Sequence, residues 1–281
     1  MLRAADVWFA YDKAPVLRGV GLTVPDGAIV GILGPNGSGK TTLLRVLAGT
    51  RRPHRGTVTL DDAPLASFAR GDLARRMAVV PQETHLAFDY TVAEVTMMGR
   101  YPHLGAFEIE GPEDIAVIDE TLASTGTLHL KDRLFATLSG GEKQRVVIAA
   151  ALAQIKTDGG HTGGYLLLDE PTASLDLGYQ LEVAALLRRL HGERGVTILI
   201  STHDLGLAGT LCDSLVMIRG GEVVANGGTD TVLTPENVRA VFGVEAEILR
   251  RPSGQRIVVP LGPGKELPPE GGSYGEGGSR P

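Results

Sequence analysis

Hydrophobic residues are concentrated in short runs that alternate with longer amphipathic stretches along the chain. The short runs are together rich in β-branched residues, are bounded by Gly, Pro or charge, and lie at residues 27–33, 76–81, 165–171, 196–202 and 213–219. Such runs are typical of strands buried on both faces of a parallel sheet. Helical patterns lie between them, at residues 41–49, 144–155 and 180–195. This alternation predicts an α/β fold.

The same pattern predicts how the chain is divided. Residues from about 88 to 155 are mostly helical in pattern and carry no comparable apolar run, which predicts a helical subdomain inserted into the sheet domain. A helical stretch at residues 234–243 precedes two β-like runs that the turn signal PSG separates. Gly and Pro dominate the residues that follow. The predicted units are a main domain over residues 1–250, a C-terminal β extension over 251–261 and a disordered tail over 262–281.

Composition and charge narrow the class of protein. With 43% hydrophobic residues, the 281-residue chain can form a core, but no segment approaches the length of about 18 apolar residues that a membrane span needs. Any role at a membrane is therefore expected to be peripheral. The net charge of −6 argues against a nucleic-acid binder with a basic face. The single cysteine, Cys212, favours a reducing compartment, and the first residues lack the apolar run of a signal peptide.

Residues 34–41, GPNGSGKT, match the phosphate-binding loop G-x-x-x-x-G-K-[ST], or Walker A motif, between a predicted strand and a predicted helix. Glycines let backbone N–H groups converge on phosphate oxygens, and the helix N-terminus favours the same anion. Lys40 is expected to contact the β- and γ-phosphates and Thr41 to bind Mg²⁺. A chance Gly-rich turn is the alternative. The predicted nucleotide contacts here are Gly34, Pro35, Asn36, Gly37, Ser38, Gly39, Lys40, Thr41 and Thr42.

Two adjacent carboxylates, Asp169 and Glu170, end the most apolar run of the chain. They would be costly there unless they served a cation and a polarised water. We expect Asp169 to be a carboxylate of the Mg²⁺ site, either bound directly to the metal or hydrogen-bonded to one of its ligands. Glu170 would project to the other side of an extended chain and orient or deprotonate the water that attacks the γ-phosphate. The alternative is an exposed strand end with two ordinary acids.

Residues 138–145, LSGGEKQR, place Ser139, Gly140 and Gly141 immediately before a predicted helix. The helix N-terminus would be a second anion site. The alternative is a plain N-cap in which Ser139 and Glu142 form a capping box. Here the sequence resembles the ATP-binding cassette (ABC) ATPases of ABC transporters. LSGGE is their signature motif and is far more specific than the phosphate-binding loop.

The resemblance extends over about residues 1–243 and implies a fold and a set of roles. The fold would be a P-loop NTPase with a mostly parallel sheet core, an N-terminal antiparallel β region and an inserted helical subdomain. Tyr11 would stack on adenine, Gln82 would bridge Mg²⁺, the attacking water and the transporter, and His203 would contact the γ-phosphate. Singly, each could be an ordinary structural residue. Residues 174–176 match the D-loop, which comprises Ser174, Leu175 and Asp176.

The family also implies the cofactors and the assembly. ATP and Mg²⁺ would be bound, with Thr41, Gln82 and Asp169 at the metal and Glu170, Gln82 and His203 in catalysis. Two chains would pair head to tail as a homodimer, so that each ATP lies between Lys40 of one chain and the signature motif of the other. That pairing would explain two anion sites that one chain does not bring together. The remaining ATP contacts would be Ser139, Gly140, Gly141, Glu142 and Asp176.

One subgroup of the family fits best. Residues 91–105, TVAEVTMMGRYPHLG, with HLKDR at 129–133, resemble the ATPases of type II importers for ferric siderophores, haem and vitamin B12. An insertion at 155–164 resembles the haem branch, or is a neutral surface loop in which His161 is a solvated residue. Ala150 and Gly206 depart from the family pattern. We expect the ATP-hydrolysing subunit of an importer for an iron chelate, haem or a ferric siderophore, at the cytoplasmic face of the membrane.

The importer would need a separate permease and, indirectly, a substrate-binding protein. The permease is expected to dock near Gln82 and residues 97–105, where Met97 and Met98 would be flexible apolar walls and Arg100 and Tyr101 polar anchors at the rim. The alternative for this segment is a helix end whose methionines pack in the core. The alternative function is a cytosolic ABC ATPase without a permease that acts on nucleic acid or protein complexes.

Overall fold

A six-stranded sheet forms the centre of the computed structural model, which describes residues 1–105, 107–155, 163–173, 175–252 and 255–264. The strand order is β10-β9-β3-β8-β7-β6, and neighbours from β9 to β6 are parallel whereas β10 is antiparallel to β9. All five predicted apolar runs are strands of this sheet, as expected for a core strand buried on both faces. The strands are β3 (Ile29–Leu33), β6 (Met77–Val80), β7 (Tyr165–Asp169), β8 (Thr197–Thr202), β9 (Ser214–Arg219) and β10 (Glu222–Gly228).

A second, antiparallel sheet is formed mainly by the N-terminal residues, in the order β2-β1-β4-β5. Its apolar face and one face of the central sheet enclose helix α1 (Lys40–Leu47), whose leucines 43, 44 and 47 are fully or almost fully buried. This packing fixes the start of α1, and therefore the preceding loop, at the carboxyl end of β3. The strands are β1 (Leu2–Tyr11), β2 (Ala14–Val24), β4 (Arg55–Leu60) and β5 (Ala63–Pro64).

Helices cover the other face of the central sheet. Helices α5 (Gly140–Gln154), α6 (Leu177–Arg194) and α7 (Leu205–Leu211) contribute to one apolar cluster with β3, β6, β7, β8 and β9. Helix α6 ends at Gly195, which has a φ of 62°. Glycine adopts this left-handed conformation without the cost that a Cβ would add, which explains the sharp end of the helix.

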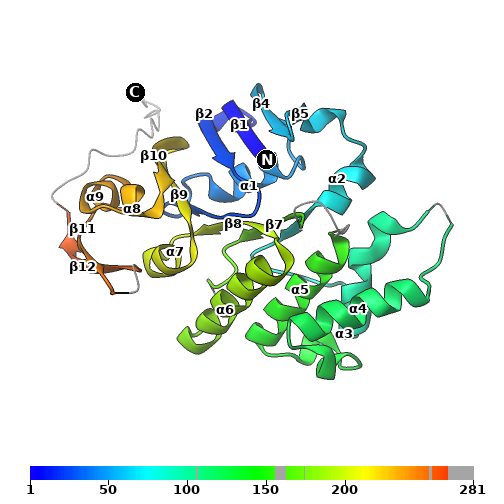
Figure 1. The fold of residues 1–281 in the computed structure, drawn as a ribbon. Coiled ribbons are helices and arrows are strands. Elements are labelled where there is room, and N and C mark those ends of the chain that lie inside the picture. Colours follow the sequence, from blue (N-terminus) through cyan, green and yellow to red (C-terminus); the bar gives the residue numbers. More distant parts are fainter. Residues whose placement is uncertain (106, 156–162, 174, 253–254, 265–281) are drawn as a thin grey trace, which may run out of the picture.

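The inserted helical subdomain is present, and it lies on one side of the sheet in Figure 1. It comprises α3 (Val92–Met97), the 3₁₀ helix η2 (Met98–His103), α4 (Pro112–Ser124), η3 (Leu128–Leu130), η4 (Phe135–Thr137) and α5, and a short helix α2 (Arg70–Arg76) precedes β6. Its own apolar cluster includes Val92, Ile118, Leu122 and Phe135. Helix α5 contributes Val146 and Ala149 to this cluster and Ile148 and Leu152 to the cluster under the sheet.

The C-terminal part differs from the predicted boundaries. Strands β11 (Val244–Arg250) and β12 (Arg256–Pro263) form an antiparallel pair beside α8 (Thr229–Val232) and α9 (Pro235–Phe242), at the side opposite the helical subdomain (Figure 1). The β extension is therefore longer than 251–261 at both ends, because α9 already stops at Gly243, whose φ is 70°, and pairing continues to Pro263. Gly262 and Pro263, assigned to the tail, belong to β12.

Several sequence predictions fall outside the described residues. These are most of the predicted tail, over 265–281, two residues of the PSG turn, the D-loop Ser174, and residues 156–162 of the insertion with His161. Within the described part of the chain, no helix combines the length and the apolar character that crossing a membrane requires.

Candidate active site

The loop between β3 and α1 has the tight backbone that its glycines allow. A Cβ on Gly34 would lie 2.4 Å from the carbonyl oxygen of Ile218 and 2.5 Å from Ser38 Oγ. Gly39, the N-cap of α1, has a φ of 102°, which side chains rarely adopt. The loop thus places the N-terminus of α1 next to the backbone of residues 34–39, the arrangement that binds phosphate groups in proteins.

A hollow of about 410 Å³ lies over this loop and joins residues that are far apart in the sequence. Gln82, which follows β6, and Glu170, which follows β7, both line it. The central sheet achieves this because the carboxyl ends of parallel strands meet at one edge. The other lining residues are Val16, Asn36, Gly37, Gly39, Lys40, Thr41 and Thr42.

Lys40 is buried at the base of the hollow, with 4% of its side chain exposed. Its ammonium group donates to the carbonyl oxygens of Gly34 at 2.9 Å and Pro35 at 3.1 Å, and it lies 3.0 Å from Glu170 Oε1. The loop carbonyls therefore hold the ammonium group under the start of α1.

Asp169 lies directly behind Thr41 and is almost completely buried. Its Oδ1 accepts hydrogen bonds from Thr41 Oγ1 at 3.0 Å and from Ser201 Oγ at 2.6 Å. Ser201 also accepts the backbone N–H of Glu170 at 3.1 Å, so this one hydroxyl orients both carboxylate residues. Ser201 was not among the site residues predicted from the sequence. Its signal there was a polar residue within the apolar run 196–202, and only the structure shows that it pairs with Asp169.

The donor atoms here suit Mg²⁺. Among the described residues, no group of three or more His, Cys, Asp or Glu side chains forms a metal site. Magnesium, however, is usually held by one or two carboxylates together with substrate phosphates and water. The hydroxyl of Thr41 and the amide of Gln82 provide such oxygen ligands at the hollow, and the carboxylate of Asp169 lies behind Thr41, from which it accepts a hydrogen bond.

The backbone at Glu170 differs from the extended chain that the sequence predicted. β7 ends at Asp169, and Glu170 has a φ of 44°, so the chain is not extended there and the two side chains do not follow strand alternation. Its carboxylate is 9% exposed, with Oε1 facing Lys40 and Oε2 lying 3.1 Å from His203 Nδ1. Asp169 therefore contacts Thr41, and Glu170 contacts the preceding residue, Lys40. The two are not ordinary acids at an exposed strand end.

Tyr11 lies at the end of β1, next to Thr42 at the start of α1. A hydrogen bond to Thr42 and the nearby guanidinium of Arg45 lower the pKa of Tyr11. The ring packs edge-on against Phe9, with 5.0 Å between centroids, and the residue remains 39% exposed. A supported but accessible ring of this kind can stack on a planar base.

The signature segment forms the capping box that the sequence allowed. Ser139 Oγ accepts the N–H of Glu142 at 3.3 Å, and Glu142 Oε2 accepts the N–H of Ser139 at 2.8 Å. This backbone hydrogen bond is the main cause that lowers the pKa of Glu142. A Cβ on Gly141 would lie 2.5 Å from the ring of Tyr179, which explains a glycine where α5 approaches α6.

The signature residues 139–142 do not line the hollow over the phosphate-binding loop, and neither does Asp176, the N-cap of α6. Among these signature residues, only Gly140 approaches the site, since it lines a neighbouring hollow with Gln82 and Glu170, and none of the four lines the hollow that contains Lys40. This separation is what a site shared between two chains requires.

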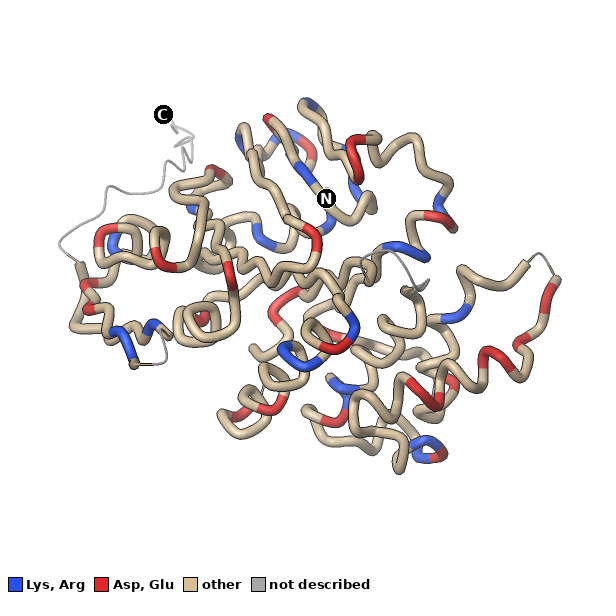
Figure 2. Tube along the Cα trace, viewed as in Figure 1, with Lys and Arg blue, Asp and Glu red and all other residues tan. Residues whose placement is uncertain are grey.

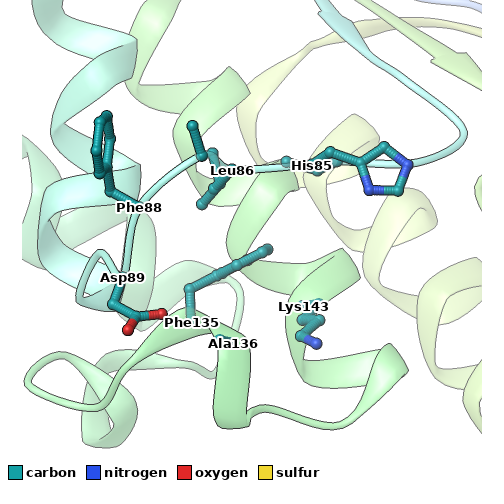
Figure 3. A pocket seen from close by; sticks show the side chains of 9 residues that line it. His85, Leu86, Phe88, Asp89, Phe135, Ala136 and Lys143 are labelled. Atoms are coloured by element: carbon teal, nitrogen blue, oxygen red, sulfur yellow. The ribbon is translucent and has the colours of Figure 1, made fainter.

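A second hollow, of about 460 Å³, lies on the helical subdomain between the loop after Gln82 and the start of α5. Figure 3 shows the loop of His85, Leu86, Phe88 and Asp89 crossing beside Phe135, with Lys143 projecting from α5. Phe88 is 72% exposed at this hollow. We call it the subdomain groove, and it is lined by Thr84, His85, Leu86, Ala87, Phe88, Asp89, Phe135, Ala136 and Lys143.

The subdomain groove adjoins the active site. A third hollow, of about 310 Å³, is lined by Gln82 and Glu170 on one side and by His85, Phe135 and Lys143 on the other. The last three residues also line the groove. A single wall of side chains therefore separates the groove from the space beside Glu170.

The segment 97–105 does not line the groove, and one of its predicted roles is wrong. Arg100 is not a rim anchor, because its side chain is only 14% exposed and donates to Asp114 Oδ1 and to the carbonyl of Ala153, both at 2.9 Å. Met97 packs against the apolar cluster of the subdomain, whereas Tyr101 is 56% exposed. Helix α3 ends at Met97, and the 3₁₀ helix η2 continues directly from it to His103.

Comparison with known proteins places the geometry in a family context. The chain matches the family model described as ABC transporter over residues 17–173. The hemin import ATP-binding protein HmuV of Gloeobacter violaceus is 42% identical over 270 residues, which cover 96% of this chain and 97% of that protein. The HmuV of Bordetella pertussis is 42% identical over 255 residues, or 90% of this chain and 95% of that protein.

Solved structures share the fold. An ABC transporter assigned to the metal-chelate type, in an inward-facing conformation, superposes with a TM-score of 0.80 at 28% identity and covers 92% of this chain and 96% of that chain. The dimeric structure of MJ0796, a bacterial ABC transporter cassette, has a TM-score of 0.67 at 27% identity and covers 82% of this chain and 99% of that chain.

Proposed function

This chain belongs to the ABC transporter family of ATP-binding proteins and is an ATPase, and we propose that it powers the import of an iron chelate, haem first, through a separate permease. The observation that carries the proposal is the single hollow at which Lys40, Thr41, Gln82 and Glu170 meet. Haem is favoured over a ferric siderophore because the relatives at 42% identity are named for hemin import.

The residues of the hollow divide the chemistry between them. Lys40 and the loop N–H groups bind the phosphates, and Tyr11 stacks on adenine. Thr41, Gln82 and Asp169 would hold Mg²⁺, which when bound would supply positive charge to the β- and γ-phosphates. Glu170 orients the attacking water and accepts its proton. His203, which is hydrogen-bonded to Glu170 Oε2, contacts the γ-phosphate.

Replacing Glu170 by glutamine tests this assignment. The change keeps the shape but removes the base, so ATP hydrolysis should slow by about two orders of magnitude or more while ATP still binds. Phosphate release from the assembled transporter measures the rate, and Glu113→Gln, an exposed acid on α4, is the matched control. Equal rates for Glu170→Gln and the parent would overturn the catalytic role.

We propose that the working unit is a head-to-tail pair of chains. The signature residue Ser139 caps α5 away from the hollow that contains Lys40, so a second chain is needed to bring the two together. A Ser139→Arg variant should bind ATP at Lys40 but fail to pair in its presence, because a bulky cation would replace the small cap. Unchanged ATP-driven pairing of this variant, measured by light scattering, would contradict the shared site.

The permease is proposed to dock near Gln82, in the subdomain groove, and docking along residues 97–105 stays a separate prediction, with the 56% exposed Tyr101 as its remaining anchor. The groove offers exposed Phe88 and shares its inner wall with the hollow beside Gln82 and Glu170, which gives a short path from the docked segment to the reaction. Phe88→Asp should prevent copurification with the integral-membrane partner. Ile109→Asp, which is 82% exposed outside the groove, is the matched control and should not.

The alternative function, a cytosolic ABC ATPase that acts on nucleic acid, has less support. Figure 2 shows Lys and Arg interspersed with Asp and Glu along the described trace, and the net charge is −6. Location at the cytoplasmic membrane face follows from the proposed permease. Stimulation of ATP hydrolysis in proteoliposomes by a haem-loaded binding protein would support the cargo, whereas stimulation only by a ferric siderophore or cobalamin would overturn it.

A further inference from the structure

The side chains of Lys40 and Glu170 form an ion pair with each other. Their charged atoms are 3.0 Å apart, and both side chains are more than nine-tenths buried. The three hydrogens of the Lys40 ammonium group have three partners, namely two loop carbonyls and Glu170 Oε1. The second carboxylate oxygen of Glu170 faces His203. The ammonium group of Lys40 therefore has no free hydrogen for a further partner, and each carboxylate oxygen of Glu170 already faces a neighbouring side chain.

The proposed roles require both groups to change partners. Lys40 must donate to a phosphate oxygen, and Glu170 must accept from a water molecule. Of the three contacts of Lys40, the one with Glu170 is the contact that a phosphate replaces. The carbonyls of Gly34 and Pro35 belong to the tight backbone of the loop, whereas a phosphate oxygen offers the same negative charge as the carboxylate and repels it.

We propose that this ion pair is an autoinhibitory contact, in which Lys40 masks the base until a terminal phosphate draws Lys40 away and frees Glu170 Oε1. The inference rests on the proposed roles of these two residues. The contact of His203 Nδ1 with Oε2, at 3.1 Å, does not involve Lys40 and need not break when Lys40 leaves Oε1. Glu170 Oε1 is therefore released to accept from a water molecule by the same event that binds the phosphate.

ADP affinity without Mg²⁺ tests the exchange independently of hydrolysis. Binding to the parent must break the ion pair, so Glu170→Gln should bind ADP about tenfold more tightly by calorimetry. Removing any nearby negative charge would also favour a phosphate. Asp169→Asn controls for that effect, because Asp169 contacts Thr41 and Ser201 but not Lys40, and it should gain no more than about threefold. Equal gains in the two variants would overturn the proposal.

A double-mutant cycle in the absence of nucleotide tests the contact itself. Lys40→Met and Glu170→Gln should each lower the melting temperature, because each leaves a buried charge without its partner. The melting temperature of the double variant should fall by clearly less than the sum of the two single falls, and additive falls would overturn the proposal. If the parent fails to bind ADP, or Lys40→Met binds it normally, the nucleotide site itself is wrong. If ADP binding depends on Lys40 but Glu170→Gln and Asp169→Asn gain equally in ADP affinity, the nucleotide site stands and only the masking of Glu170 is refuted.

Discussion

Replacement of Arg100 by methionine should unfold the helical subdomain more easily, because Arg100 ties three of its helical segments together. From η2, the guanidinium donates to Asp114 in the first turn of α4 and to the carbonyl of Ala153 near the end of α5. Asp114 also accepts the backbone N–H of Gly111 at 3.0 Å. Methionine keeps the apolar stem of the side chain but leaves the Asp114 carboxylate with half of its partners.

The size of the effect follows from burial. Breaking a buried ion pair from one side costs about 3–5 kcal/mol, and the side chains here are 14% and 12% exposed, so some water reaches them. We expect a loss of about 3 kcal/mol in the free energy of unfolding, or a fall in melting temperature of about 6–12 °C for a domain of this size. Urea unfolding followed by circular dichroism at the helical band measures it.

The pH dependence gives a second readout of the same contact. The hydrogen bond from Gly111 and then the ion pair with Arg100 lower the pKa of Asp114 in the folded chain. A lowered pKa contributes stability above the unfolded value of about 3.9, and this contribution is lost as the pH falls through the folded value. The difference between the parent and Arg100→Met should therefore be full at neutral pH and shrink below about pH 4.

Tyr101→Ala is the matched control for Arg100→Met, because the neighbouring Tyr101 is 56% exposed and should change stability by no more than about 0.5 kcal/mol. The reasoning is refuted if Arg100→Met unfolds within about 1 kcal/mol of the parent at neutral pH. In that case Arg100 would again be available as a docking residue.

Three further changes have expected outcomes that the structure determines. Gly99→Ala should cost about 2 kcal/mol or more in urea unfolding, because the new Cβ would lie 2.1 Å from the carbonyl oxygen of Ala150; an unchanged midpoint would show that η2 can move away. Asp204→Ala should cost about 1 kcal/mol, since Asp204 caps α7 through two backbone N–H groups, and Asp204→Asn should restore most of it. Gly34→Ala should abolish ADP binding in calorimetry, because its Cβ would lie 2.4 Å from Ile218; normal affinity would refute the close-packed loop.

The fold was predictable where the signal was local in the sequence. Continuous apolar runs gave the buried strands of the central sheet, because both faces of each strand are covered. Strand β10 carries the alternating burial of an edge strand and was not assigned from its pattern. The limits of the β extension were misplaced because β11 follows α9 without a linker, at Gly243.

The site residues, too, were predictable only where the signal was local in the sequence. The phosphate-binding residues are contiguous, so a motif could identify them. The masking of Glu170 depends on a φ of 44°, and the part played by Ser201 depends on the pairing of β7 with β8, neither of which a linear pattern shows. Arg100 was misread because its partners, Asp114 and the carbonyl of Ala153, lie 14 and 53 residues away along the chain.

Helix α5 packs against the sheet on one side and against the subdomain helices on the other, which has a consequence for how this sequence can vary. From Gly141 to Gln154 no residue is exposed. Most helices in globular proteins have a solvent face along which substitutions accumulate with little effect. In the second half of α5 the least buried positions, 147, 150 and 154, are still only half-buried, so a saturation library should show a much narrower stripe of tolerance along this helix than along α6. Adaptation of this ATPase to a new partner is therefore expected to change other elements and, within α5, mainly Lys143, which lines the subdomain groove.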